Sequence, residues 1–329
     1  MKRRKFLAAS AACLAGASAA PSGWAQGVSL KGASNLGDEH IYTRTLRRFF
    51  DLVNQYAGQP VASVVHRNGE LGSDKDYFIY MNQGISVDCG LISPAHMSTF
   101  ARSAPLMDVP FLFRDGAHWE RAMAADVLKP LADEVTRKAD VMILGYAGGG
   151  VRNIVSNRPA TTLAELKGLK IRVQGAPIHS KIFQAIGAAP SVISYQEVYN
   201  AIQSGVINAL ENEAAGIEQM KFYEVAPNVL LTRHIITVRP LCFSGKTFRR
   251  LPPRVQEAVL RAGREASLFG RQTEAQEDRA KLEQMAKAGR LRMIPFAERA
   301  QAEAISRPIL AEYIRQIGAE GIHTRIESL

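Results

Sequence analysis

Arginine side chains inside apolar, strand-like segments are the groups in this sequence with the clearest chemical potential. Arg172 interrupts the apolar run LKIRV at residues 169–173. A buried cation is costly unless it is paired, and the planar guanidinium can hold a carboxylate through two parallel hydrogen bonds. Arg172 therefore indicates either a carboxylate-binding site or an ion pair with a carboxylate of the protein itself. The internal ion pair is the commoner arrangement, and residue types alone leave both open.

Motifs for catalysis and metal binding are missing from the sequence. The segment SGKT at residues 244–247 is similar to the end of a phosphate-binding loop, but such a loop needs glycine at the position of Pro240. There is no GxSxG, HExxH or EF-hand pattern, and the seven histidines lack the spacing of metal ligands. We therefore predict no catalytic residue, no metal site, no cofactor and no enzymatic activity.

The first 25 residues have the layout of an export signal. Residues 2–5 are basic, residues 6–20 are apolar and rich in alanine, and small residues precede a cleavage point near Ala25. The run RRKFL at residues 3–7 fits the twin-arginine pattern of folded-protein export, and a general secretory signal is the alternative. A lipid anchor on Cys13 is not expected, because the preceding residues do not form a lipobox. We predict a periplasmic protein from which residues 1–25 are removed.

Charge and composition exclude several functional classes. The chain is 47% hydrophobic and 22% charged, as in ordinary globular proteins. Four of its 41 basic residues and none of its 31 acidic residues lie in the signal, so the remainder carries a formal net charge of +6. This charge is scattered and accompanies no nucleic-acid-binding motif, so we predict no nucleic-acid partner and a weak preference for anions. No later apolar run reaches the roughly 18–20 residues of a spanning helix, so the mature protein is not expected to cross a membrane.

The remaining chain alternates strand-like and helix-like segments, which predicts an α/β protein. Helices are expected at residues 43–56 and 177–186, and strands at residues 28–33, 61–66, 87–92, 140–146, 169–173 and 206–210. The strand at 140–146 is expected to end in a flexible point at glycines 148–150. A helical segment from residue 252 to about 288 is long enough to brace two lobes. Cys89 and Cys242 lie in strand-like runs and are expected to be buried free thiols, although export would allow a disulfide.

Six short motifs follow one another in the chain after the signal. They are DVPFLF at 108–113, LKGLKIRV at 166–173, GAAP at 187–190, EVY at 197–199, QSGVINALEN at 203–212 and KFYEV at 221–225. In this order and spacing they resemble the solute-binding proteins of the tripartite ATP-independent periplasmic (TRAP) transporters, of the type that includes dicarboxylate and sialic acid receptors. The resemblance covers nearly the whole mature chain. It favours a ligand carboxylate over an internal ion pair as the partner of Arg172.

The resemblance implies a two-lobed periplasmic binding protein fold of the α/β class, with a hinge and a long helix shared by both lobes. It places lobe I at residues 26–149 and 238–277, and lobe II at residues 150–237 and 278–329. The expected function is capture of a small organic acid, such as a hydroxy or sugar acid, and its delivery to the membrane subunits of a TRAP transporter. A sensory protein that reports to a membrane receptor and an exported enzyme are the alternatives.

The resemblance also implies roles for individual residues. Arg172 matches the arginine that binds the ligand carboxylate, and Arg152 matches a second arginine in a Gly-x-Arg setting. Asn212 matches an asparagine of the Glu-Asn segment, and Tyr195 an aromatic position that often holds Phe. Further neutral or polar contacts are expected from Gln174, and less directly from Asn35 and Ser93.

Two features near Asn212 refine these expectations. The keto-acid branch of the family often has tryptophan where this chain has Asn212, so a metal-assisted ligand site is not expected here. Glu211 and Glu213 are candidates to hold the Arg172 guanidinium in place before a ligand arrives, and a surface position is the alternative for either.

Overall fold

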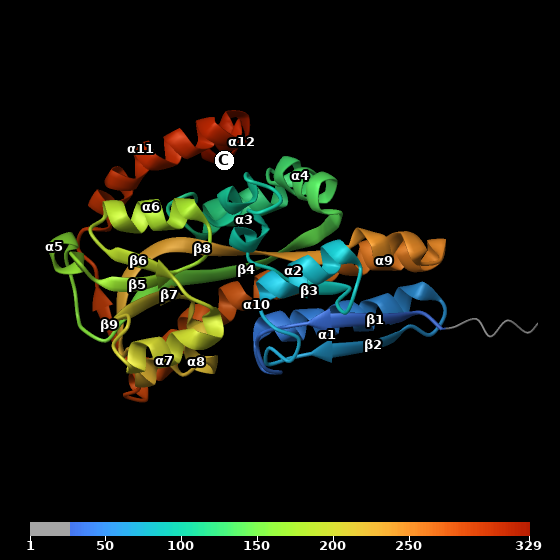
Figure 1. Cartoon of the computed structure of the whole chain (residues 1–329), viewed down its shortest axis with the longest axis horizontal. Helices are drawn as coiled ribbons and strands as arrows, with labels where there is room; N and C mark the ends of the chain where they lie inside the picture. Colours follow the sequence, from blue (N-terminus) through green and yellow to red (C-terminus); the bar gives the residue numbers. More distant parts are fainter. Residues whose placement is uncertain (1–26) are drawn as a thin grey trace, which may run out of the picture.

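Residues 27–329, which the computed structural model describes, fold around one mixed β-sheet of nine strands (Figure 1). The predicted signal and Cys13 lie outside the described residues. The strand order is β2-β1-β3-β8-β4-β7-β5-β6, and β9 pairs with β8. The strands are β1 Ser29–Ala33, β2 Ala62–His66, β3 Cys89–Leu91, β4 Val141–Ser156, β5 Lys170–Val173, β6 Ala189–Val192, β7 Ala209–Asn212, β8 Asn228–Ser244 and β9 Arg292–Pro295.

Two long antiparallel strands, β4 and β8, tie the sheet together. Their pairing runs from Val141 opposite Ser244 to Ser156 opposite Asn228. On one side β1 pairs in parallel with β2 and β3, and on the other β5 pairs in parallel with β6 and β7. Two separate parallel α/β units therefore share the same central strands, as expected for the predicted two-lobed fold. We call them the β1–β3 half and the β5–β7 half.

Helices cover the sheet of each half. Figure 1 shows α1 and α2 beside β1–β3, α6 to α8 around β5–β7, and α11 and α12 along the outer edge of the molecule. The helices are α1 Ile41–Ala57, α2 Asp74–Gln83, α3 Gly116–Ala124, α4 Lys129–Ala139, α5 Leu163–Leu166, α6 Pro177–Ala185, α7 Val198–Gln203, α8 Ala214–Gln219, α9 Gly245–Arg250, α10 Pro253–Lys287, α11 Arg299–Ile317 and α12 Glu320–Glu327. The strands and helices predicted from apolar spacing are thus confirmed, with ends that differ by a few residues except for the strand expected at 140–146, which runs to Ser156.

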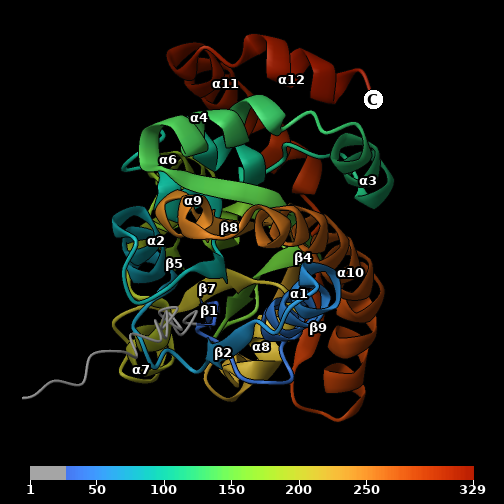
Figure 2. The ribbon, with the colours of Figure 1, turned by 90° about the vertical axis from the view of Figure 1, so that its right-hand side faces the viewer.

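The predicted long helix is α10, which has 35 residues and passes from the β1–β3 half to the β5–β7 half (Figures 1 and 2). It packs against α1, β4 and α8. Gly263 and Gly270 let α10 approach β4 and α1 closely. A Cβ atom at these positions would lie 2.4 Å from Leu144 of β4 and 2.5 Å from Thr45 of α1. The helix therefore contacts both halves along its length.

The expected strand end at glycines 148–150 is wrong, because β4 continues through these residues to Ser156. Their conformation is nevertheless unusual. Gly148 and Gly149 have φ angles of 110° and 108°, and the β4–β8 register shifts between Gly148 and Val151. A Cβ atom on Gly148 would lie 2.2 Å from the carbonyl oxygen of Thr237. The glycines form a bulge between the two halves, and the long partner strand β8 keeps β4 extended beyond it.

Cys89 and Cys242 are both buried and free. They lie on adjacent strands, but Cys89 packs in the core beneath α1 and Cys242 in the core beneath α2. Their side chains therefore project from opposite faces of the sheet, and the prediction of two free thiols is confirmed.

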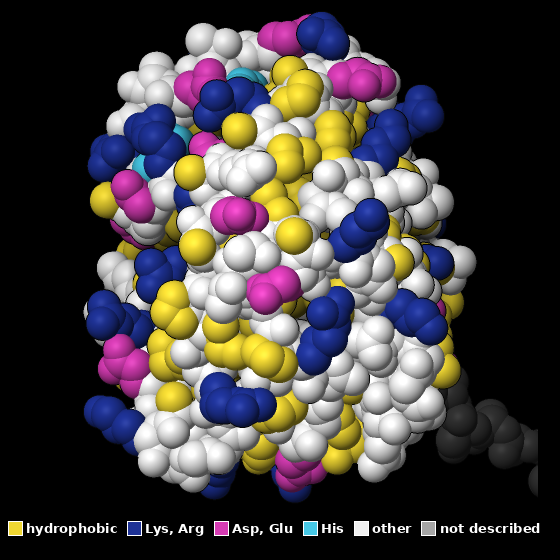
Figure 3. All heavy atoms as spheres, turned by 90° about the vertical axis from the view of Figure 1, so that its left-hand side faces the viewer, with side chains coloured by type: hydrophobic (Ala, Val, Ile, Leu, Met, Phe, Trp, Pro, Cys, Tyr) yellow, Lys and Arg dark blue, Asp and Glu magenta, His cyan; other side chains and the backbone are white. Residues whose placement is uncertain are grey.

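The outer surface carries mixed charges. On the face shown in Figure 3, lysines and arginines alternate with acidic, apolar and neutral side chains and do not merge into a basic band. Between residues 27 and 329 no helix has both the length and the apolar composition needed to cross a bilayer.

Candidate ligand-binding site

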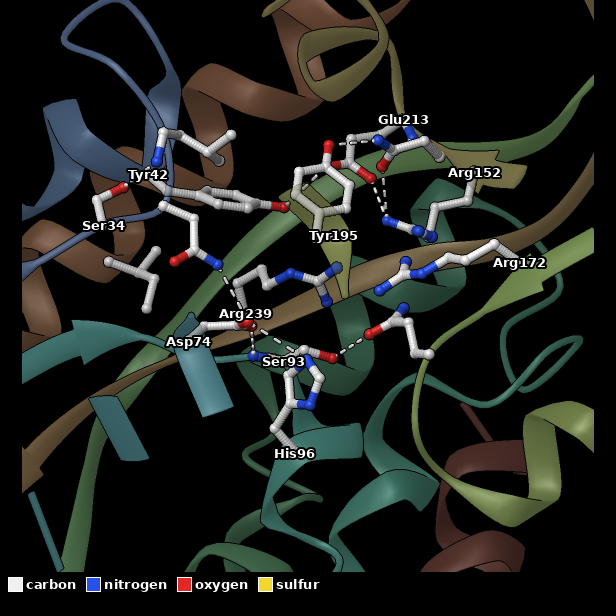
Figure 4. A pocket seen from close by; sticks show the side chains of 15 residues that line it. Ser34, Tyr42, Asp74, Ser93, His96, Arg152, Arg172, Tyr195, Glu213 and Arg239 are labelled. Carbon is white, nitrogen blue, oxygen red and sulfur yellow. Dashed lines mark hydrogen bonds and ion pairs between the residues drawn. The ribbon is translucent and has the colours of Figure 1, made fainter. Parts of the chain in front are cut away.

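A pocket lies between the β1–β3 half and the β5–β7 half (Figure 4). It holds about 580 Å³ of empty space, its opening included. The part of this space that a water-sized molecule can occupy is about 70 Å³. All seven residues predicted as ligand contacts line it: Asn35, Ser93, Arg152, Arg172, Gln174, Tyr195 and Asn212. Strands and loops far apart in the sequence therefore meet at one site.

Arg172, on β5, is buried with 4% of its surface exposed. Its Nε donates to the carbonyl oxygen of Ile193 at 3.0 Å, and its guanidinium carbon lies 5.5 Å from the ring centre of Tyr195. Within residues 27–329 no carboxylate oxygen lies at ion-pair distance from it. Burial lowers the pKa of Arg172, since it costs the cation its hydration. The internal ion pair is thus absent among the described residues, and both terminal nitrogens remain available.

Arg152, on β4, is in the opposite situation. A guanidinium has five N–H groups, and those of Arg152 donate to both carboxylate oxygens and the backbone carbonyl of Glu211, to the side-chain oxygen of Asn212, and to Glu213. Burial alone would lower the pKa of Arg152, but the two glutamates hold it above its ordinary value. Arg152 lines the pocket with its hydrogen-bonding capacity already used.

Glu211 and Glu213 therefore hold Arg152, and the expectation that one of them positions Arg172 is not met. Glu211 also lies 3.5 Å from Nε2 of His234. Although burial raises the pKa of Glu211, Arg152 and His234 outweigh it and keep that pKa well below its usual range. The carboxylate is thus ionised, and this network fixes the end of β7 against β4.

Asn212 and Tyr195 extend the same network to the pocket wall. The amide nitrogen of Asn212 donates to the hydroxyl of Tyr195 at 2.7 Å, and its oxygen accepts from Arg152 at 2.9 Å. The Tyr195 ring packs edge-on against Phe222, with ring centres 5.6 Å apart. Arg172 thus lies beside an aromatic ring whose orientation is fixed.

Polar contacts also cross from one half to the other. The hydroxyl of Ser93, just after β3, donates to the side-chain oxygen of Gln174, just after β5. The amide nitrogen of Gln174 and the side-chain oxygen of Asn35 are buried without a hydrogen-bond partner among the described residues. An unused donor and an unused acceptor therefore border the same cavity.

Sequence reasoning missed Arg239, Asp74 and His96, which also line the pocket. Arg239 lies in the apolar strand segment IITVRPL of β8, at residues 235–241. The argument made for Arg172, a cation inside an apolar strand, applies equally here and would have found it. Asp74 and His96 lie in short polar segments that give no comparable signal.

Comparison with known proteins supports the same picture. Residues 32–316 match the family described as bacterial extracellular solute-binding protein, family 7. A solute-binding protein of Sulfitobacter sp. (strain NAS-14.1) is 50% identical over 293 residues, which cover 89% of each chain.

Solved structures agree with this match. The crystal structure of a TRAP periplasmic solute-binding protein from Sulfitobacter sp. NAS-14.1 with bound α-D-taluronate has a TM-score of 0.90 at 49% identity, covering 91% of this chain and 97% of that chain. A TRAP periplasmic solute-binding protein from a Bradyrhizobium species, in complex with D-galacturonate, has a TM-score of 0.86 at 24% identity, covering 92% of this chain and 100% of that one. At this level of identity, the Bradyrhizobium structure shows a likeness of fold alone. The chain belongs to family 7 of the bacterial extracellular solute-binding proteins, the receptors of TRAP transporters.

Proposed function

We propose that the protein captures a hexuronate, a sugar acid with one carboxylate, and delivers it unchanged to the membrane subunits of a TRAP transporter. The observation that carries the proposal is the buried guanidinium of Arg172, which faces the pocket without a carboxylate partner among residues 27–329. An unpaired buried cation favours an anionic ligand. The relative that is 49% identical binds such an acid, α-D-taluronate.

In this proposal the ligand carboxylate pairs with the terminal nitrogens of Arg172, and Tyr195 lies against the ligand. The free amide nitrogen of Gln174 donates to the same end of the ligand, and the free oxygen of Asn35 accepts from a hydroxyl group. A ligand whose hydroxyl groups leave these buried polar atoms unpaired binds weakly, and this gives the site its specificity. Arg152 and Asn212 contribute by holding the wall of the pocket in place.

The proposed setting is the periplasm. We infer export through the signal at residues 1–25, so that the mature chain begins near Gln26. The family to which the chain belongs consists of solute-binding receptors, and the proposal includes no chemical step on the ligand.

A thermal-shift screen tests the proposal. It compares D-taluronate, D-galacturonate and D-glucuronate with the neutral hexoses of the same configuration and with succinate. A ligand at 100 times its Kd adds about 2.7 kcal/mol of stability, which for a chain of this size raises Tm by about 5 °C. At least one uronate should give such a shift, and its neutral hexose should give none.

Two outcomes would contradict the proposal. If a neutral hexose stabilises the protein as much as the uronate does, the carboxylate is not the anchoring group. If succinate alone stabilises it, the ligand is a dicarboxylate and not a sugar acid.

A further inference from the structure

Arg239 brings a second buried guanidinium to the pocket. Only 6% of its surface is exposed, and Figure 4 shows its guanidinium and that of Arg172 directed into the same space. One nitrogen, Nη1, donates to Asp108 Oδ2 at 3.0 Å and to the carbonyl oxygen of Val238 at 3.1 Å. Within residues 27–329 its Nε and Nη2 have no hydrogen-bond partner. Arg239 therefore offers free N–H groups to the pocket.

The charge of Arg239 is already balanced, unlike that of Arg172. Asp108, at the end of the turn at Ala104–Asp108, is completely buried and forms an ion pair with Arg239. A cation that has its own carboxylate gains little from a second anion. It can still donate hydrogen bonds to uncharged oxygens. The two arginines therefore favour different partners, a carboxylate at Arg172 and a neutral oxygen at Arg239.

Other side chains of the pocket also favour neutral groups. Asp74 accepts from Asn35 Nδ2 at 3.1 Å and lies 3.3 Å from Nε2 of His96. The Asn35 oxygen is a buried acceptor without a partner in the described chain. Free donors from Arg239 and the free acceptor of Asn35 suit hydroxyl groups, which both donate and accept. A second carboxylate in this pocket would also meet the carboxylate of Asp74, which is unfavourable.

We propose that Arg239 is a specificity-determining residue that donates hydrogen bonds to hydroxyl oxygens of the sugar acid, while Arg172 holds its carboxylate. Asp108 and Asp74 make the pocket reject a second carboxylate. The site thereby distinguishes a uronate from the aldarate of the same configuration, in which the anomeric carbon is a second carboxylate. This inference rests on the proposed function and adds the selection of monoanionic over dianionic sugar acids.

Calorimetric titration with D-taluronate and the matching aldarate, D-talarate, tests the inference. The parent protein should bind D-taluronate more tightly than D-talarate. Arg239→Gln should weaken D-taluronate binding about 10- to 100-fold, the effect expected for lost hydrogen bonds from a charged donor. Asp108→Asn should raise the ratio of D-talarate to D-taluronate affinity at least about tenfold, because it leaves Arg239 without its balancing charge.

A second variant and matched controls keep the test decisive. Asp108→Asn should fold, because the new amide can accept from Arg239 and donate to His179, which lies 3.9 Å from Asp108. Asp74→Asn, at the more exposed edge of the pocket, should raise the same affinity ratio independently. Arg249→Gln and Asp140→Asn change a surface ion pair of the same type and should leave both affinities unchanged.

The outcomes separate this inference from the proposed function. If the parent binds D-taluronate but Arg239→Gln binds it within about threefold, or neither aspartate variant changes the ratio, the inference is wrong and the proposed function stands. If the parent binds neither sugar acid, or if Arg172→Ala binds D-taluronate as the parent does, the proposed function fails and this inference fails with it.

Discussion

Arg152 and Arg172 line the same pocket but differ in what surrounds them. Arg152 uses all its donors on Glu211, Asn212 and Glu213, whereas Arg172 has one hydrogen bond within residues 27–329, to a backbone carbonyl. Removing one partner of a buried ion pair leaves an uncompensated charge, whereas removing an unpaired buried cation does not. Truncation should therefore destabilise the fold at Arg152 and leave its stability nearly unchanged at Arg172.

We predict that Arg152→Ala lowers the free energy of unfolding by about 3–5 kcal/mol, because two buried carboxylates lose their cation. Arg172→Ala should unfold within about 1 kcal/mol of the parent, since no ionic partner is left behind. Urea unfolding without ligand measures both variants side by side. Equal losses of stability would show that Arg172 also has a structural partner.

The sequence predicted the surroundings of Arg172 better than the network around Arg152, for a physical reason. Arg172 stands out because its own strand is apolar, which is a local property of the sequence. The network around Arg152 depends on pairing between β4 and β7, which are separated by a whole α/β unit of the chain. Local patterns contain no information on such pairing, so Glu211 was expected beside the wrong arginine. Arg239 had the same local signal as Arg172 and was overlooked.

At the scale of elements, helix α1 begins at a histidine that has to be neutral. Nδ1 of His40, the residue before the helix, accepts from the backbone N–H of Tyr42 at 3.2 Å. His40 is buried, and burial lowers its pKa from 6.5 to about 4. A protonated ring could not accept this hydrogen bond. The start of α1, which packs against α10, is thus coupled to pH.

The sign of the effect follows from proton binding. Between pH 4 and 6.5 the unfolded chain holds a proton on this histidine more often than the folded protein does. Stability should therefore rise with pH through this window, by about 3 kcal/mol at most from this residue. His40→Asn keeps a side-chain oxygen that can cap the helix, but this residue does not titrate. The stability of the variant should therefore rise less between pH 4 and 6.5 than that of the parent, by up to about 3 kcal/mol. Urea unfolding at a series of pH values measures the difference.

If the profiles of the parent and of His40→Asn run parallel between pH 4 and 6.5, the coupling of α1 to pH is wrong.

At the scale of the whole molecule, the pocket is assembled from both halves of the sheet, which β4, β8 and α10 connect. We propose that the halves are lobes with the boundaries given above, near residues 149, 237 and 277. The bulge at Gly148 and Gly149 lies at the first of these boundaries. A bend in the two connecting strands would move the lobes as rigid bodies and expose the buried polar lining.

We predict that ligand compacts the molecule. Small-angle scattering should show a smaller radius of gyration in saturating D-taluronate than without it, because closure brings the two lobes together around the ligand. The neutral hexose at the same concentration is the control and should leave the scattering unchanged. An identical radius of gyration with and without the uronate would indicate a site that is closed before binding.

The most direct test of the account is a calorimetric titration of D-taluronate into the parent protein, Arg172→Ala and Arg172→Lys. Arg172→Ala should lower affinity at least about 30-fold while the protein stays folded, because the carboxylate loses its charged partner. Arg172→Lys should also bind weakly, since an ammonium cannot present two parallel N–H groups to a carboxylate. If Arg172→Ala binds D-taluronate with the affinity of the parent, Arg172 is not the anchor and the central claim is contradicted.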